Sequence, residues 1–124
     1  MALPLNKERL AALYDFLAEC PPFCDWNLPG SEDVIFKVTR SRDTAGYHKL
    51  WKMGRKKLHH EIGISGYCCG WTNRVLWVMG HEMVHLHQAA VDMESSHTTH
   101  NEAFRQLGLD VCAVHGWDPH EFNS

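Results

Sequence analysis

The sequence predicts an α+β fold, in which an N-terminal helix precedes a three-stranded antiparallel sheet and two further helices follow. Two observations carry this prediction: apolar residues recur at helical spacing near both ends of the chain, and they alternate with polar residues between positions 34 and 65. A length of 124 residues fits a single domain over residues 1–124. The composition, 44% hydrophobic and 22% charged, is typical of a globular protein.

The first helix is predicted over Leu5–Cys20. Its apolar residues Leu10, Tyr14 and Leu17 lie at helical spacing, and Asn6 is a suitable N-cap. Two consecutive prolines then end the helix, because proline cannot continue the helical hydrogen-bond ladder.

Three strands are predicted after this helix, over Val34–Arg40, Tyr47–Met53 and Leu58–Ser65. Apolar and polar residues alternate along them, as expected when one face of a sheet is buried. The connections between the strands are short and rich in turn-forming or basic residues. Short connections between consecutive strands predict an antiparallel meander.

The helical pattern returns over Trp71–Ala90, which contains the HExxH motif HEMVH at residues 81–85. Each residue of a helix turns by about 100°, so His81 and His85 lie on one side, one turn apart. Neutral imidazoles suit Zn²⁺, and a catalytic zinc ion usually takes three protein ligands and a water molecule. Glu82 is placed to deprotonate that water rather than to bind the ion. The motif therefore predicts one catalytic Zn²⁺ and requires a third ligand elsewhere.

The third ligand must come from a later segment, because the compact HExxHxxGxxH pattern is absent. A second helix is predicted over residues 97–114, following a polar loop. Its candidate ligands are His97, His100 and Glu102. His100 shares a helix face with Phe104, whereas Glu102 lies in a segment similar to the one that supplies a glutamate ligand in thermolysin-like enzymes. The spacing alone leaves these alternatives open.

Four segments of the chain stand in a specific order: TAGY at residues 44–47, EIGIS at 61–65, HEMVH at 81–85, and His100 with Phe104 four residues later. This combination resembles the SprT-like zinc metallopeptidases, and the resemblance covers about residues 5–110. The ordered set is more specific than HExxH alone. Asn101 departs from the family pattern, which usually has glycine at this position.

The resemblance implies a zincin-like fold and a zinc-dependent metalloendopeptidase that hydrolyses peptide bonds through a zinc-activated water. It assigns His81, His85 and His100 as the zinc ligands and Glu82 as the catalytic general base. The substrate would be a protein or peptide, which could lie extended along an exposed sheet edge. No zinc-ribbon pattern follows the second helix, so the chain is similar to minimal catalytic domains of the bacterial or phage type.

A basic run with interleaved aromatic residues lies between the second and third predicted strands. Its cations are Lys49, Lys52, Arg55, Lys56 and Lys57. Such residues can bind phosphate while aromatic rings stack on bases, so a nucleic-acid contact is one interpretation. A solvated basic hairpin is the commoner explanation of such a run, and the net charge of −3 gives no global nucleic-acid signature. The family resemblance includes proteases that digest DNA-crosslinked proteins, which fits a substrate among DNA-associated proteins.

Two other functions would use the same residues. One is a nucleic-acid-associated zinc-binding protein without protease activity, and the other is a zinc hydrolase of a non-protein amide. A peptidase or an amide hydrolase needs groups that stabilise developing negative charge. Tyr67, His59 and His115 are candidates for this role, although the sequence spacing assigns none of them.

The expected location is the cytoplasm, with no membrane partner. The first residues lack the basic and apolar regions of a secretory signal, and no stretch approaches the roughly 18 apolar residues of a membrane span. The chain contains five cysteines, and an odd number favours reduced thiols over a disulfide framework.

Overall fold

The computed structural model describes residues 5–53, 57–67, 72–90 and 100–123. The described part contains helices and a three-stranded sheet, which confirms the predicted α+β class. In chain order the elements are α1 (Lys7–Ala18), the 3₁₀ turns η1 (Phe23–Asp25) and η2 (Ser31–Asp33), β1 (Val34–Thr39), β2 (Gly46–Met53), β3 (Lys57–Ser65), α2 (Thr72–Ala90), α3 (Glu102–His115) and α4 (Pro119–Asn123).

The sheet is mixed, so the predicted antiparallel meander is wrong. The strand order is β1-β3-β2, with β3 parallel to β1 and antiparallel to β2. Residues 40–45 therefore cross the end of β3 instead of forming a hairpin. Gly66 N–H donates to the Thr39 carbonyl at 3.0 Å, and Ser65 N–H donates to the Ala45 carbonyl at 2.8 Å. A connection of this length can span the roughly 10 Å between two strands that flank a third.

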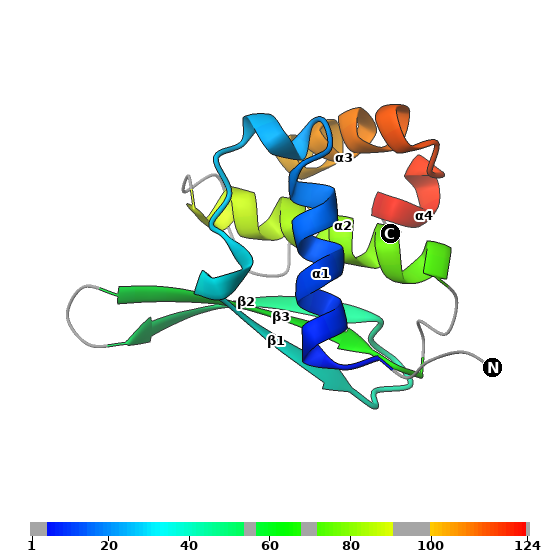
Figure 1. Ribbon diagram of the computed structural model, residues 1–124. Coiled ribbons are helices and arrows are strands. Elements are labelled where there is room, and N and C mark those ends of the chain that lie inside the picture. The colour runs from blue at the N-terminus through cyan, green and yellow to red at the C-terminus, as the bar shows by residue number, and fades with distance from the viewer. Residues whose placement is uncertain (1–4, 54–56, 68–71, 91–99, 124) are drawn as a thin grey trace.

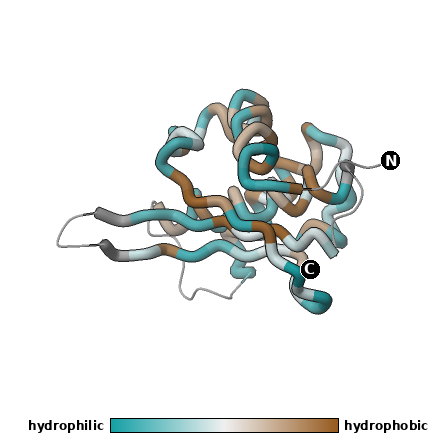
Figure 2. Tube along the Cα trace, turned by 60° about the horizontal axis from the view of Figure 1, so that its bottom comes forward, coloured by the Kyte–Doolittle hydropathy of each residue, from teal (hydrophilic) through white to brown (hydrophobic). Residues whose placement is uncertain are grey.

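The helices cover one face of this sheet (Figure 1). α1 and α2 contact the strands, while α3 and α4 pack on α2. Figure 2 shows hydrophobic segments where the sheet passes under the helices and a mainly hydrophilic chain toward the β2–β3 hairpin. The core between these layers includes the fully buried side chains of Leu10, Tyr14, Leu17, Ile62, Ile64, Met79, Met83 and Leu86.

α1 begins where Asn6 caps it, as the sequence predicted. The Asn6 side chain accepts a hydrogen bond from the Arg9 N–H at 2.8 Å, which satisfies a donor that has no partner within the helix. The predicted apolar face of Leu10, Tyr14 and Leu17 is the face that the helix buries.

A polar cluster on the uncovered face of the sheet explains how a strand containing Glu61 can be central. Tyr47 Oη donates to Glu61 Oε2 at 2.5 Å, and Trp51 Nε1 donates to Oε1 at 3.0 Å. Burial alone would raise the pKa of Glu61, but these donors and the charge of Lys37, 3.6 Å away, hold it below its usual range. The Tyr47 ring lies over Gly63, where a Cβ would come within 1.8 Å of a ring carbon.

The helix after α2 is shorter than predicted. α3 starts at Glu102 rather than at residue 97, and Asn101 is its N-cap, accepting from the Phe104 N–H at 2.9 Å. His100 therefore precedes this helix, so its predicted place within the helix is wrong. The reason is that an asparagine side chain stabilises a helix start better than a helix interior. His97 lies outside the described residues.

The C-terminal residues, for which the sequence predicted no element, form α4. Its Phe122 is fully buried. None of the helices in the described ranges combines the length and the apolar character that crossing a bilayer requires.

Candidate metal centre

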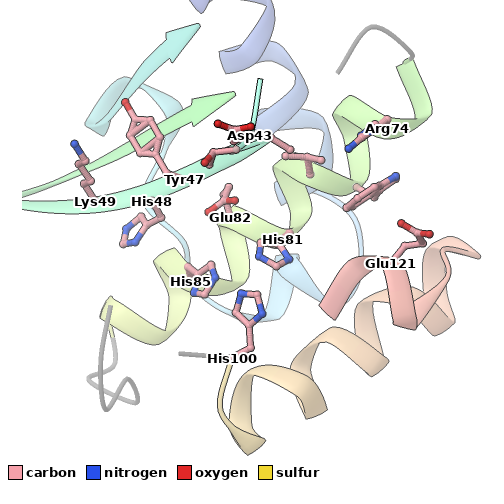
Figure 3. Close-up of a pocket in the computed structure, with 15 residues that line it drawn as sticks. Asp43, Tyr47, His48, Lys49, Arg74, His81, Glu82, His85, His100 and Glu121 are labelled. Carbon is pink, nitrogen blue, oxygen red and sulfur yellow. The ribbon is translucent and has the colours of Figure 1, made fainter. Parts of the chain in front are cut away.

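Three histidines converge beside a cleft: His81 and His85 from α2, and His100 from the residue pair that precedes α3 (Figure 3). One ring nitrogen of each lies within 4.8 Å of the others. The ring centroids are 5.0 Å apart for His81–His85, 4.8 Å for His81–His100 and 5.1 Å for His85–His100. Three imidazoles that converge in this way form a donor set that can hold a metal ion.

Backbone carbonyls of α4 orient two of these rings. His81 Nδ1 lies 2.5 Å from the Phe122 carbonyl oxygen, and His100 Nδ1 lies 2.9 Å from the Asn123 carbonyl oxygen. A carbonyl oxygen only accepts, so each Nδ1 carries the proton and donates. The lone pair of each ring is then on Nε2, which is the nitrogen available to a metal ion.

Phe104 forms the wall behind the three rings. It stacks on His100 with centroids 4.5 Å apart and on His85 at 4.4 Å, and its edge meets His81 at 4.9 Å. The Phe104 side chain is fully buried. Because it contacts all three histidines, it restricts their rotation and keeps water from the rear of the site.

The electrostatics keep the two helix histidines neutral. Burial lowers the pKa of His81 to about 4, although its bond to the Phe122 carbonyl acts in the opposite direction. Burial also lowers the pKa of His85 to about 3, with smaller contributions from nearby His81, His100 and His48. Both imidazoles are therefore deprotonated at neutral pH, the form that binds metal ions.

Glu82 lies beside the histidines without belonging to the group of three. Its side chain is only 4% exposed, and burial raises its pKa to about 8. α2 approaches β2 closely at this point, since a Cβ on Gly46 would lie 3.1 Å from Glu82 Oε2 and 2.9 Å from Val78 Cγ1. Glycine at position 46 thus leaves room for the carboxylate between helix and strand.

A cleft of about 660 Å³ passes the histidines and Glu82 (Figure 3). Strand β2 and the loop before it form one wall, and α2 forms the other. The lining residues are Asp43, Thr44, Ala45, Gly46, Tyr47, His48, Lys49, Arg74, Trp77, Val78, His81, Glu82, His85, His100 and Glu121.

Some of the site residues predicted from the sequence lie in the cleft and others lie outside it. His81, Glu82, His85 and His100 come together in the cleft, whereas Glu102 is exposed on the first turn of α3 and is not part of the histidine group. The three candidates for charge stabilisation, Tyr67, His59 and His115, do not line the cleft. His115 instead bonds the Pro21 carbonyl at 2.9 Å.

A buried polar contact fixes the start of α3 and with it His100. Gln88, seven residues after His81 on α2, is fully buried, and its Nε2 donates to Asn101 Oδ1 at 3.2 Å. The same oxygen caps the helix by accepting from the Phe104 N–H. Asn101 thereby connects α2 to His100, the residue directly before Asn101 in the chain. Glycine at position 101 could not form this contact, since it has no side-chain acceptor.

Several contributors to the site were missed from the sequence. The α4 carbonyls carry no side-chain signature, so no residue pattern could have indicated them. His48 could have been found, because it lies within the second predicted strand, Tyr47–Met53, directly after the TAGY segment.

We expect the substitution Gln88→Leu to weaken zinc binding by about tenfold, since contacts that orient metal ligands are typically worth 10–100-fold in affinity. The unfolding free energy of the metal-free protein should change by only about 1 kcal/mol, because leucine fills a similar volume. Zinc affinity is measured by competition with a chelating dye, and stability by urea denaturation.

The matched control is Asn101→Asp, which keeps an oxygen for both the Phe104 N–H and Gln88 Nε2 and should retain affinity. Equal zinc affinity of wild type and Gln88→Leu would show that this contact does not position His100.

The substitution Glu82→Gln should stabilise the metal-free protein at alkaline pH. Folding raises the pKa of Glu82 from 4.5 to about 8, so its contribution to stability is fully present below about pH 4.5 and is lost as the pH rises through 8. Glutamine avoids this loss, and the variant should exceed wild type by on the order of 1–4 kcal/mol at pH 9. Urea denaturation in chelator at pH 4.5, 7 and 9 measures the difference, with exposed Glu19→Gln as control. A pH-independent difference would contradict the buried-carboxylate explanation.

Comparison of the chain with models of known protein families, with curated proteins and with solved structures finds no match. The function of the protein must therefore be inferred from its residues and the geometry of the site.

Proposed function

We propose that the protein is a zinc-dependent metalloendopeptidase with a zincin-like fold and that it hydrolyses peptide bonds. The observation that carries the proposal is the convergence of three imidazoles beside a buried carboxylate in a cleft along strand β2. His81, His85 and His100 are the proposed ligands, and Glu82 is the proposed general base. The resemblance of the ordered motifs to SprT-like metallopeptidases supports the same assignment.

The donor set suits zinc. Three neutral nitrogen ligands with a nearby carboxylate are typical of catalytic zinc sites, which keep one position open for water or substrate. Bound zinc would supply Lewis acidity, polarising the scissile carbonyl and making water a stronger acid. The α4 carbonyls orient His81 and His100 as expected for metal-ligating histidines.

Glu82 moves the proton in the proposed reaction. It accepts a proton from water as the oxygen of that water forms a bond to the carbonyl carbon. It then gives the proton to the amine nitrogen as the C–N bond breaks, which leaves a carboxylic acid and an amine. Burial gives Glu82 a pKa of about 8 in the metal-free state, and the charge of a bound cation would lower it toward the range that a base at neutral pH requires.

Strand β2 suits an extended peptide substrate. It lies at the edge of the described sheet, because the order is β1-β3-β2, and four of its residues line the cleft. Backbone groups on the outer side of an edge strand can pair with an added strand. A peptide paired with β2 would pass beside Glu82 and the histidines, which favours a peptide over a small amide as substrate.

The substitution Glu82→Gln should reduce cleavage of fluorescein-labelled casein by at least about 100-fold, because it removes the general base, while leaving zinc content near one ion per chain. The substitution His100→Ala should lower zinc affinity by at least about tenfold, since it removes one ligand. Casein cleavage and metal analysis measure the two effects.

The control is Glu102→Ala, which removes an exposed carboxylate outside the histidine group and should retain zinc. If Glu102→Ala lost zinc more severely than His100→Ala, the ligand set would have to include Glu102. Full cleavage by Glu82→Gln would refute the assigned base.

Binding of single-stranded nucleic acid is a second candidate function, and the uncovered face of the sheet favours it. Lys49 Nζ lies 5.1 Å from the ring centre of Tyr47 and 5.9 Å from that of Trp51, and Trp51 is 46% exposed. A cation beside exposed aromatic rings can contact phosphate and stack with bases. The side chains of the other predicted cations lie outside the described part: Lys52, Arg55, Lys56 and Lys57.

We expect a salt-sensitive gel shift with single-stranded DNA if this surface binds nucleic acid. Trp51→Ala should weaken it by about 5–100-fold, because stacking on one base contributes roughly 1–3 kcal/mol. Joint replacement of Lys56 and Lys57 by glutamine should weaken it and reduce its salt dependence. Lys7→Gln, on α1, is the control. Absence of any shift at low salt would remove nucleic acid as a partner of this surface.

A further inference from the structure

His48 is the histidine of the cleft that the metal centre does not use. It lies on β2 and lines the same cleft as His81, His85 and His100 (Figure 3). Among the described residues, the group whose nitrogens lie within 4.8 Å of one another consists of His81, His85 and His100, without His48. His48 is therefore beside the proposed ligands but is not one of them.

On β2, His48 is two residues away from the position beside Glu82, the proposed base. Gly46 lies against the Glu82 carboxylate, and His48 is the next residue on the same side of the strand. Two residues advance a strand by roughly 6.5 Å. His48 is also close enough to contribute to the lowered pKa of His85. Along β2, His48 thus lies one two-residue repeat from the glycine that contacts the proposed base.

A second histidine holds the His48 ring. His48 Nε2 lies 2.9 Å from His60 Nδ1 on β3, and the ring centroids are 5.2 Å apart. Burial lowers the pKa of His60, which favours its neutral form. When the His60 Nδ1–H donates to His48 Nε2, the neutral His48 ring carries its own proton on Nδ1. In this tautomer His48 is a hydrogen-bond donor at Nδ1, and the contact with His60 fixes its ring orientation.

We propose that His48 is a catalytic residue that donates an N–H hydrogen bond to the carbonyl oxygen of the scissile peptide bond, and that His60 is its positioning residue. This inference rests on the proposed peptidase function. As water adds to the carbonyl carbon, the C=O π electrons move onto the oxygen, which becomes negatively charged. A donor already in place stabilises that charge without reorganisation. Glu82 takes the proton of the water, so His48 only donates and transfers none.

The position of His48 explains why it fits this role better than the three candidates from the sequence. Tyr67 is 60% exposed and lies under Arg42, and neither His59 nor His115 lines the cleft. A donor two residues along β2 from the glycine beside the base can reach the oxygen while the base reaches the water. Since the oxygen gains its charge only during reaction, the contact should act on kcat more than on KM.

The test uses the zinc-loaded full chain and a quenched fluorescent peptide taken from a site that the protein cuts in casein. We expect His48→Ala to lower kcat by about 10–1000-fold with KM changed less than about threefold, because removing one such donor has effects of this size. His48→Gln, which keeps an N–H donor, should recover part of the loss. His60→Leu should lower kcat less than His48→Ala does. His59→Gln, next to His60 in sequence and outside the cleft, should match wild type.

Two binding measurements separate this role from a structural one. Zinc affinity of His48→Ala should equal that of wild type. A phosphonamidate analogue of the peptide is a tetrahedral mimic of the charged state, and the affinity of His48→Ala for it should fall in parallel with kcat/KM. Binding of the uncut peptide is compared in chains that carry Glu82→Gln, with and without His48→Ala, and the two affinities should be equal. Unchanged kcat in His48→Ala, or a loss of zinc affinity equal to the loss of kcat, would overturn the role of His48 in an active peptidase. A zinc-loaded wild type that neither cleaves casein nor binds the phosphonamidate would overturn the peptidase function, and the inference with it.

Discussion

The two hydrogen bonds from His81 and His100 to the carbonyls of Phe122 and Asn123 determine how the metal centre is built. They fix the protonated nitrogen of each ring and thereby the nitrogen that faces the ion. The carbonyls can reach the rings because α4 packs closely on α3 at Gly108, where a Cβ would lie 2.3 Å from Asn123 Oδ1. The C-terminal segment is consequently part of the site.

Burial disfavours the charged forms of His81, His85 and Glu82. It lowers the pKa values of His81 and His85 and raises that of Glu82, so the metal-free site favours the neutral forms of these three groups. A divalent cation reverses the preference at Glu82, since it stabilises a nearby carboxylate. Metal binding and the proposed activation of Glu82 as a base would therefore be coupled through one electrostatic environment, which a solvent-exposed cluster of the same residues would lack.

Local patterns carried much of the fold. The helix face of Leu10, Tyr14 and Leu17 and the cap at Asn6 were predictable, because helical spacing and capping depend on neighbours in sequence. The three histidines were predictable as a set only through the ordered motifs. The later start of the second predicted helix, at Glu102 instead of residue 97, was not, since it depends on Asn101 and its distant partner Gln88. The contacts of the α4 carbonyls could not be predicted, because every residue type has a backbone carbonyl.

Strand order was the decisive failure of sequence reasoning, and its correction bears directly on function. Short connections predicted a meander, in which the middle strand of the sequence would have neighbours on both sides. The crossing of residues 40–45 over the end of β3 places β3 in the centre and leaves β2 at the edge. A peptide can pair with the free edge of β2 only in this order. The six residues between β1 and β2 thus determine whether the histidines lie beside an edge strand or beside a strand paired on both sides.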